Sequence, residues 1–208
     1  FIINVIASIY QTILLDTLND SNWIVKRLDE VAEFRNGTAH EQDIDDEGLY
    51  IVVNSKFISK NGTVRKYSNE QKSPLYRGEI VFVMSDVPKG KTLAKCFIID
   101  ENDKYTLNQR ICAFSNIKID SKFFFYCINR SPYFLSFDNG ENQTNLRKND
   151  ILKCPIPVPP LPIQKQIVAK LDSLSEKVKQ LESNYKQVLT DCDELKKALL
   201  KQAFEGML

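Results

Sequence analysis

The chain has 208 residues, of which 43% are apolar and 26% charged, so it can bury a core and is expected to fold as a soluble protein. Its formal net charge of +1 excludes a histone-like DNA wrapper but allows a local basic face on a neutral body. The cysteines are scattered, without a CxxC pair: Cys96, Cys112, Cys127, Cys154 and Cys192. This spacing argues against structural zinc and favours reduced, buried thiols in the cytoplasm.

Residues 1–22 begin with the uncharged stretch FIINVIASIYQTILL. The stretch lacks a basic leader, contains polar residues and falls short of the ~20 apolar residues that span a bilayer. We therefore favour an N-terminal helical segment packed on the body, ending at the turn sequence Asn19–Asn22, over a targeting or membrane segment. The first residue is not methionine, which suggests a trimmed or partial chain.

Residues 23–160 are predicted to form one compact domain of strands and short helices. Runs of β-branched and aromatic residues bounded by turn residues predict strands at Leu49–Val53, Ile80–Met84, Cys96–Ile99 and Ile111–Phe114. Helices are predicted at Leu28–Phe34 and Ser121–Asn129, the latter followed by an aromatic-rich segment to Phe137. The expected fold class is α+β.

Residues 161–208 are predicted to form a long coiled-coil helix. Apolar residues recur at alternating steps of four and three, which is the spacing of a heptad seam. One set is Leu171, Val178, Tyr185, Cys192 and Leu199, and the other is Ile167, Leu174, Leu181, Val188 and Leu195. At ~1.5 Å per residue such a helix is roughly 60 Å long, so much of the seam needs a partner helix.

Prolines precede this helix at positions 155, 157, 159, 160 and 162. Because proline fixes its own backbone angle and keeps the preceding residue extended, we expect a stiff strap that sets the direction in which the helix leaves the domain. A flexible linker would be richer in glycine and serine.

Catalytic motifs are absent from the sequence. It has no glycine-rich phosphate loop, no GxSxG and no HExxH, and it lacks the Asn-Pro-Pro-aromatic and glycine-rich motifs of S-adenosylmethionine enzymes. His40 lies in an acidic loop, where a solvated side chain is expected. That loop lacks the glycine-turned pattern of a calcium site. We therefore expect a binding module without a cofactor or metal of its own.

Polar clusters indicate what the module binds. Arginine and lysine can neutralise phosphates or pair with guanine, while asparagine and glutamine match adenine in the major groove. Such residues gather in three places, which we take as candidate DNA-binding residues. They are Arg65, Lys66, Lys89 and Lys91; then Asn108, Gln109 and Arg110; then Gln143, Asn145, Arg147 and Lys148.

Four stretches carry a family resemblance that covers nearly all of the chain from Trp23 to the end. They are WIVKRLDEVAEFRNGTA, LNQRICAF, ENQTNLRKNDILKCPIPVPPLPIQKQIVAKLD and LKKALLKQAFEGML. The chain resembles a specificity subunit of a Type I restriction-modification system, in a half-length form with one target recognition domain and one spacer helix. Ile163 departs from the glutamate usual in this family.

The resemblance implies a non-catalytic, cytoplasmic subunit that reads half of a bipartite duplex DNA target. It also implies docking to adenine-methyltransferase subunits and motor-nuclease restriction subunits. A half-length chain is then expected to form a homodimer through its helix and to read a gapped palindrome, with half-sites within roughly 17 base pairs. The alternative hypothesis is a coiled-coil scaffold whose globular domain binds another protein, which leaves the polar clusters without a role.

Overall fold

A four-stranded antiparallel sheet lies at the centre of the fold, in the computed structural model that describes residues 23–40, 42–88 and 90–204. Its strands in spatial order are β2 (Glu33–Asn36), β9 (Ile111–Ser115), β5 (Ile80–Val83) and β7 (Cys96–Ile98). All four residues of β5 are buried, so both faces of this sheet are covered. Complete burial explains why β5 is a continuous apolar run and does not alternate with polar residues.

A second sheet covers one of these faces. It contains β4 (Tyr67–Ser68), β3 (Tyr50–Val53) and β8 (Tyr105–Leu107), with β3 and β8 parallel. Val81 and Val83 of β5 share a core cluster with residues of this sheet and with Phe57 from α3 (Ser55–Ser59). Because side chains alternate along a strand, Ile80 and Phe82 point to the other face.

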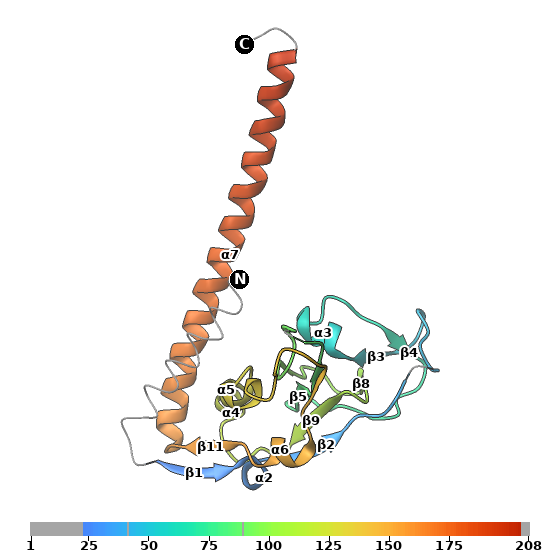
Figure 1. The fold of residues 1–208 in the computed structure, drawn as a ribbon, viewed down its shortest axis with the longest axis vertical. Coiled ribbons are helices and arrows are strands. Elements are labelled where there is room, and N and C mark those ends of the chain that lie inside the picture. The colour runs from blue at the N-terminus through green and yellow to red at the C-terminus, as the bar shows by residue number, and fades with distance from the viewer. Residues whose placement is uncertain (1–22, 41, 89, 205–208) are drawn as a thin grey trace. The chain divides into compact units, whose positions relative to one another are not determined.

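Two aromatic-rich helices cover that other face, α4 (Ser121–Ile128) and α5 (Pro132–Leu135). The rings of Phe82 and Phe134 are 4.9 Å apart, and those of Phe114 and Phe124 are 5.5 Å apart. Figure 1 shows α4 and α5 on one side of β5 and the three-stranded sheet on the other. The predicted α+β fold and the helix at 121–129 are therefore confirmed.

The predicted helix Leu28–Phe34 is wrong in its second half. Helix α2 (Leu28–Val31) ends early, and Ala32 is extended, with φ −151°. Phe34 belongs instead to β2, where it pairs with Phe114 of β9. Pairing with β9 gives this backbone a full ladder of hydrogen bonds, which outweighs the local helical preference.

The proline segment is extended, as predicted, and forms a strand. β11 (Pro155–Val158) pairs antiparallel with β1 (Ile24–Arg27). Successive backbone groups of a strand point to opposite sides, and Leu28 N–H donates to the Cys154 carbonyl at 2.9 Å. The backbone groups of Ile156 therefore face β1, while Pro155 and Pro157, which have no N–H to donate, face away.

The remaining short elements are β6 (Ser85–Asp86), β10 (Thr144–Asn145) and α6 (Lys148–Leu152). Helix α7 (Leu161–Phe204) has 44 residues, as the heptad pattern predicts. The chain divides into two compact units, with the boundary between Val168 and Ala169 inside α7. The domain limits of 23–160 and 161–208 remain a prediction, and the N-terminal segment 1–22 lies outside the described residues.

Two predictions for single residues are wrong. His40 is not solvated but buried, and Nδ1 donates to the Thr38 carbonyl at 2.7 Å while Nε2 lies 2.8 Å from the Thr106 hydroxyl. Its two ring nitrogens give it a structural role between β8 and the segment after β2. Cys192 is exposed on α7, whereas the other four thiols are buried as expected.

Candidate nucleic-acid interface

A tight turn joins β8 to β9 and carries one of the three predicted clusters, Asn108, Gln109 and Arg110. The Asn108 side-chain oxygen accepts from the Gln109 N–H at 2.9 Å, and its carbonyl accepts from the Ile111 N–H at 3.0 Å. Through these two hydrogen bonds Asn108 closes the turn, so its role is to stabilise the backbone conformation there. Gln109 and Arg110 are exposed, and their side chains project from a turn fixed by two buried strands.

The predicted cluster at 143–148 lies on β10 and on the residues beside it. Thr144 and Leu146 are buried, whereas Gln143, Asn145 and Arg147 are exposed. This alternation puts the three polar side chains on one face of an extended segment. The Gln143 amide donates to the Ser85 hydroxyl of β6 at 2.8 Å and lies 3.4 Å from the Asn145 side-chain oxygen.

Met84 brings these two clusters together. Its N–H donates to the Arg110 carbonyl at 3.2 Å, and its carbonyl accepts from the Leu146 N–H at 2.8 Å. Residues more than thirty positions apart in the sequence are thereby held on either side of one backbone unit. We call the exposed set formed here the polar face; it comprises Gln109, Arg110, Gln143, Asn145 and Arg147.

Residues 87–93 follow β6 and adjoin the polar face, and we call them the basic loop. The Asp86 carboxylate holds this loop in place. This carboxylate accepts from the backbone N–H groups of Val87 at 2.9 Å, Thr92 at 2.7 Å and Leu93 at 3.0 Å. Burial alone would raise the pKa of Asp86, but these hydrogen bonds and one with the Thr92 side chain outweigh it and hold the pKa below its ordinary value. A Cβ atom at Gly90 would lie 2.1 Å from the carboxylate, so a side chain there would push Asp86 away from these hydrogen bonds.

Other predicted residues lie around this loop and beside α6. Lys91 is exposed on the loop, and Lys89 lies outside the described residues. The Lys148 ammonium is 5.4 Å from the centre of the Phe34 ring, a cation–π contact that holds this side chain against the domain. Arg147 precedes α6 and is exposed.

Arg65 and Lys66 are not part of the polar face. The Lys66 carbonyl accepts from Val52 at 2.8 Å, whereas Asn108 N–H donates to Val53 at 3.2 Å, so β3 lies between them. The Arg65 guanidinium donates to the Gly62 carbonyl at 2.9 Å. Arg65 and Lys66 were predicted as DNA-binding residues from local charge alone, and local charge does not determine where a side chain lies in the fold.

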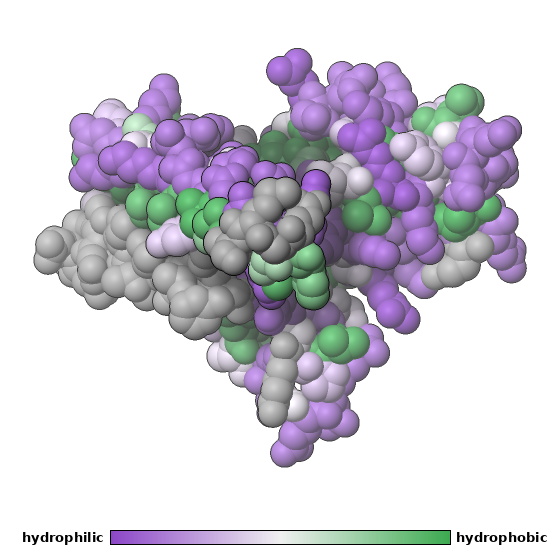
Figure 2. Space-filling model, turned by 90° about the horizontal axis from the view of Figure 1, so that it is seen from above, coloured by the Kyte–Doolittle hydropathy of each residue, from purple (hydrophilic) through white to green (hydrophobic). Residues whose placement is uncertain are grey.

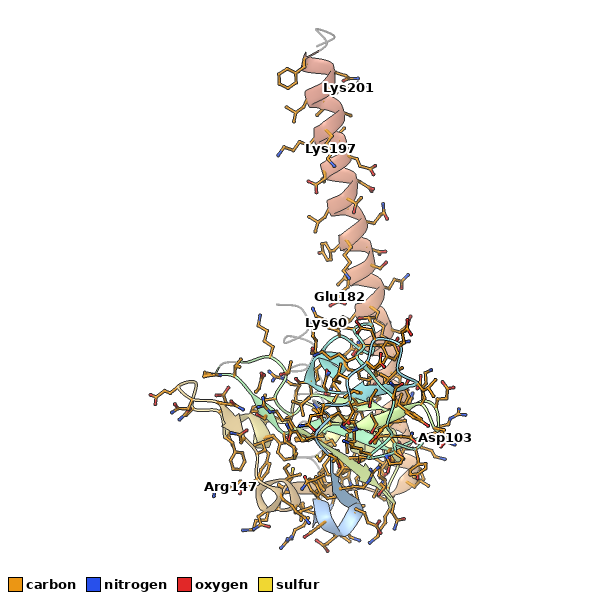
Figure 3. All side chains as sticks on the ribbon, turned by 90° about the vertical axis from the view of Figure 1, so that its right-hand side faces the viewer. Lys60, Asp103, Arg147, Glu182, Lys197 and Lys201 are labelled. Carbon is orange, nitrogen blue, oxygen red and sulfur yellow. The ribbon has the colours of Figure 1, made fainter. Side chains whose placement is uncertain are left out.

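Lys60 and Arg130 were missed by sequence analysis. They approach Lys95 in space, although the three residues come from widely separated segments. Figure 3 labels Lys60 and Arg147, which lie well apart within this unit. Lys60 and Arg130 each stand between two uncharged polar residues, so neither formed a local run of basic residues in the sequence.

The predicted partner face of α7 changes along the helix. Ile167 and Leu171 are buried, and Leu174 and Val178 are partly buried. The later seam residues are exposed: Leu181, Tyr185, Val188, Leu195 and Leu199. Near the end of the helix Cys192, Leu195, Leu199, Leu200 and Ala203 line a shallow apolar surface. Heptad spacing alone could not have separated the buried part of the seam from the exposed part.

The view in Figure 2 shows a mainly hydrophilic surface, with hydrophobic residues in small separate patches. Within the described ranges, no three histidine, cysteine or acidic residues gather as a metal site would require. The same part of the chain contains no helix that is both long and apolar enough to cross a bilayer.

Comparison of the sequence with known proteins assigns the chain to a known family. The family model described as "Type I restriction modification DNA specificity domain" matches residues 20–191. The chain is 25% identical over 199 residues to the Type I restriction enzyme EcoDI specificity subunit of Escherichia coli, covering 90% of this chain and 43% of that protein.

Solved structures share the fold. One, from work on complex assembly and conformational transition of the type I R-M system, matches with a TM-score of 0.76 at 19% identity, covering 99% of this chain and 53% of that chain. The HsdS subunit from Thermoanaerobacter tengcongensis matches with a TM-score of 0.65 at 19% identity, covering 99% and 52%. The chain thus spans about half the length of these relatives.

Proposed function

This chain belongs to the family of Type I restriction modification DNA specificity domains, and we propose that it recognises one half of a bipartite duplex DNA target. In this proposal residues 23–160 are the target recognition domain and residues 161–208 the spacer helix. The chain contributes no chemistry of its own. Methylation and cleavage belong to the adenine-methyltransferase and restriction subunits that dock on it.

The observation that carries the proposal is the junction at Met84. It holds two amide-and-arginine segments side by side, one on the turn between the buried strands β8 and β9 and the other on β10, with Arg110 and Arg147 both exposed. Arginine and amide side chains are those that pair bidentately with guanine and adenine edges. A rigid scaffold that presents them together supports base recognition, because the backbone that carries them need not be ordered on binding.

The exposed half of the α7 seam supports a partner helix. Leu181, Val188 and Leu195 are 50%, 55% and 61% exposed, although each occupies a heptad position. We propose that a second copy of this chain covers them through an antiparallel, two-fold symmetric pairing. Two identical recognition domains related by a two-fold axis would read a gapped palindrome, with a gap limited by the helix length.

The test of the polar face is the substitution of its arginines. Arg110→Ala and Arg147→Ala are each expected to weaken specific binding by about 1–3 kcal/mol if the residue reads a base. The matched control is Arg77→Ala, an exposed arginine before β5, at the end of that strand opposite Met84. Binding is measured by titration against duplexes enriched from a random pool.

The outcomes separate the two hypotheses. If both variants bind the enriched duplex as tightly as the unaltered chain, Arg110 and Arg147 are removed from the interface. The scaffold hypothesis predicts weak binding of any duplex by the unaltered chain, even with methyltransferase subunits added. Salt provides the second criterion, because phosphate contacts make DNA affinity fall steeply as salt rises.

A further inference from the structure

Three cationic residues from distant segments, Lys60, Lys95 and Arg130, lie near one another next to the basic loop. The Lys95 ammonium donates to the Ser59 carbonyl at 2.9 Å, beside Lys60 at the end of α3. Arg130 is bound to the other side of the same segment: its N–H donates to the Ala94 carbonyl at 2.8 Å, and its guanidinium donates to the Leu93 carbonyl at 3.0 Å.

The backbone at this cluster is strained. Ala94 and Arg130 both adopt the left-handed conformation, with φ 57° and φ 56°, and they are hydrogen-bonded to each other. This conformation costs a residue with a side chain ~1 kcal/mol or more, and it persists only where the surroundings impose it. The fold therefore holds these residues in a costly arrangement that places Arg130 beside Lys95.

The positive charge of the cluster is incompletely compensated. Burial lowers the pKa of Lys95, and the positive charges of Arg130 and Lys60 lower it further. Burial also lowers the pKa of Arg130, while the nearby carboxylates of Asp86 and Asp138 oppose that effect. Two acids thus face Arg130, and the ammonium of Lys95 faces mainly cations and the Ser59 carbonyl. An anion at this point would relieve the repulsion.

We propose that Lys60, Lys95 and Arg130 form a binding site for a backbone phosphate of duplex DNA, on the same unit as the polar face but apart from it. The inference rests on the proposed function. Asp86 joins the two places, because it fixes Thr92 and Leu93 ahead of Lys95 and pairs with Thr144 in β10. A phosphate held here fixes the register of the duplex while the polar face reads bases.

A purely structural role for Lys95 predicts something different. Its bond to the Ser59 carbonyl is one that any cation near a helix end can make. The matched control is Lys118, whose ammonium donates to the Glu30 carbonyl of α2 at 3.1 Å. Figure 1 shows α2 and α3 at opposite ends of the domain. Removing either lysine removes a similar bond, but only Lys95 should alter DNA binding.

The experiment compares Lys60→Gln, Lys95→Gln, Arg130→Gln and Lys118→Gln on an enriched duplex and on a random duplex over a series of salt concentrations. The first three are expected to weaken binding by the same factor for both duplexes. Each should also reduce the slope of log affinity against log salt by about one, because each removes one cation that neutralises a phosphate. Lys95→Arg retains the charge and should retain the slope.

Lys60 is exposed, so Lys60→Gln tests the site even if the other substitutions destabilise the fold. An unchanged slope in Lys60→Gln and Lys95→Gln, beside tight binding by the unaltered chain, overturns the phosphate site and leaves the proposed function intact. Failure of the unaltered chain to bind any duplex, with or without methyltransferase subunits, overturns both.

Discussion

Gly37 supports the turn of the polar face through a close approach that leaves no room for a side chain. A Cβ atom there would lie 2.1 Å from the Asn108 carbonyl oxygen and 2.8 Å from that of Leu107. Gly37→Ala is therefore expected to destabilise the fold by about 3 kcal/mol, because the backbone of Leu107 and Asn108 must move. Gly78→Ala is the comparison, since its Cβ meets no atom within 4 Å and it carries only the strain of φ 91°. Equal destabilisation of the two variants in chemical denaturation would contradict this account of Gly37.

Asp86 gives the basic loop a pH dependence with a definite sign. The folded-state pKa of Asp86 is lowered from its ordinary value of 3.8. The ionised carboxylate therefore stabilises the folded chain above that value, and this stability is lost as the pH falls through the folded-state pKa. The difference in unfolding free energy between the unaltered chain and Asp86→Asn should shrink from about pH 5 to about pH 3.

The control for this prediction is Asp46→Asn, whose side chain is exposed on the acidic loop. Urea denaturation at each pH gives the unfolding free energies. A difference between Asp86→Asn and the unaltered chain that stays constant or grows toward acid pH would show that the carboxylate does not hold the loop.

Single residues were the hardest features to predict from the sequence. The residue types of the polar face were identifiable, because amides and arginines cluster locally. The burial of His40 could not be predicted, because one of its hydrogen-bond partners is Thr106, which is 66 positions away in the sequence. Lys60 and Arg130 could not be selected from the sequence for the same reason. Each is of interest because it lies near Lys95, and only the folded chain brings these residues together.

At the scale of elements, periodicity predicted well and pairing did not. The heptad spacing indicated α7, and the apolar runs indicated β3, β5, β7 and β9. Local preference extended the helix at Leu28 too far, because nothing nearby signals that Phe34 pairs with Phe114. The prolines indicated an extended segment at 155–158, but its partner β1 lies some 130 residues away in the sequence.

Cys192 can report whether a second helix covers the exposed seam. It is the exposed thiol among the cysteines, and burial raises the pKa of Cys154 to about 12, which keeps that thiol protonated and unreactive. A maleimide should therefore modify Cys192 alone in the folded chain. Its rate should fall as protein concentration rises, because pairing covers the seam, and intact mass spectrometry measures it.

The matched variant for this prediction is Leu195→Glu, which places a charge beside Cys192 on the apolar surface. It should abolish the protection at high concentration. A rate independent of concentration, in a chain that sedimentation shows to be dimeric, would place the dimer interface elsewhere.

At the scale of the whole molecule, the structure divides the chain into two units, with the boundary between Val168 and Ala169. One unit carries the polar face and the basic loop, and the other is a helix with an exposed apolar seam. The chain spans about half the length of its relatives. The proposal of a second copy rests on the exposed seam of α7. The family likeness could be found from the sequence because the junction from Glu141 to Asp172 is so particular in its order of residue types.

The most direct test is a selection from random duplex DNA with the purified chain, with its mass in solution measured alongside. We predict a dimer that enriches a gapped palindrome, alone or after the methyltransferase subunits are added. Enrichment of no sequence in either condition would contradict recognition of DNA by the polar face and leave the scaffold as the better explanation.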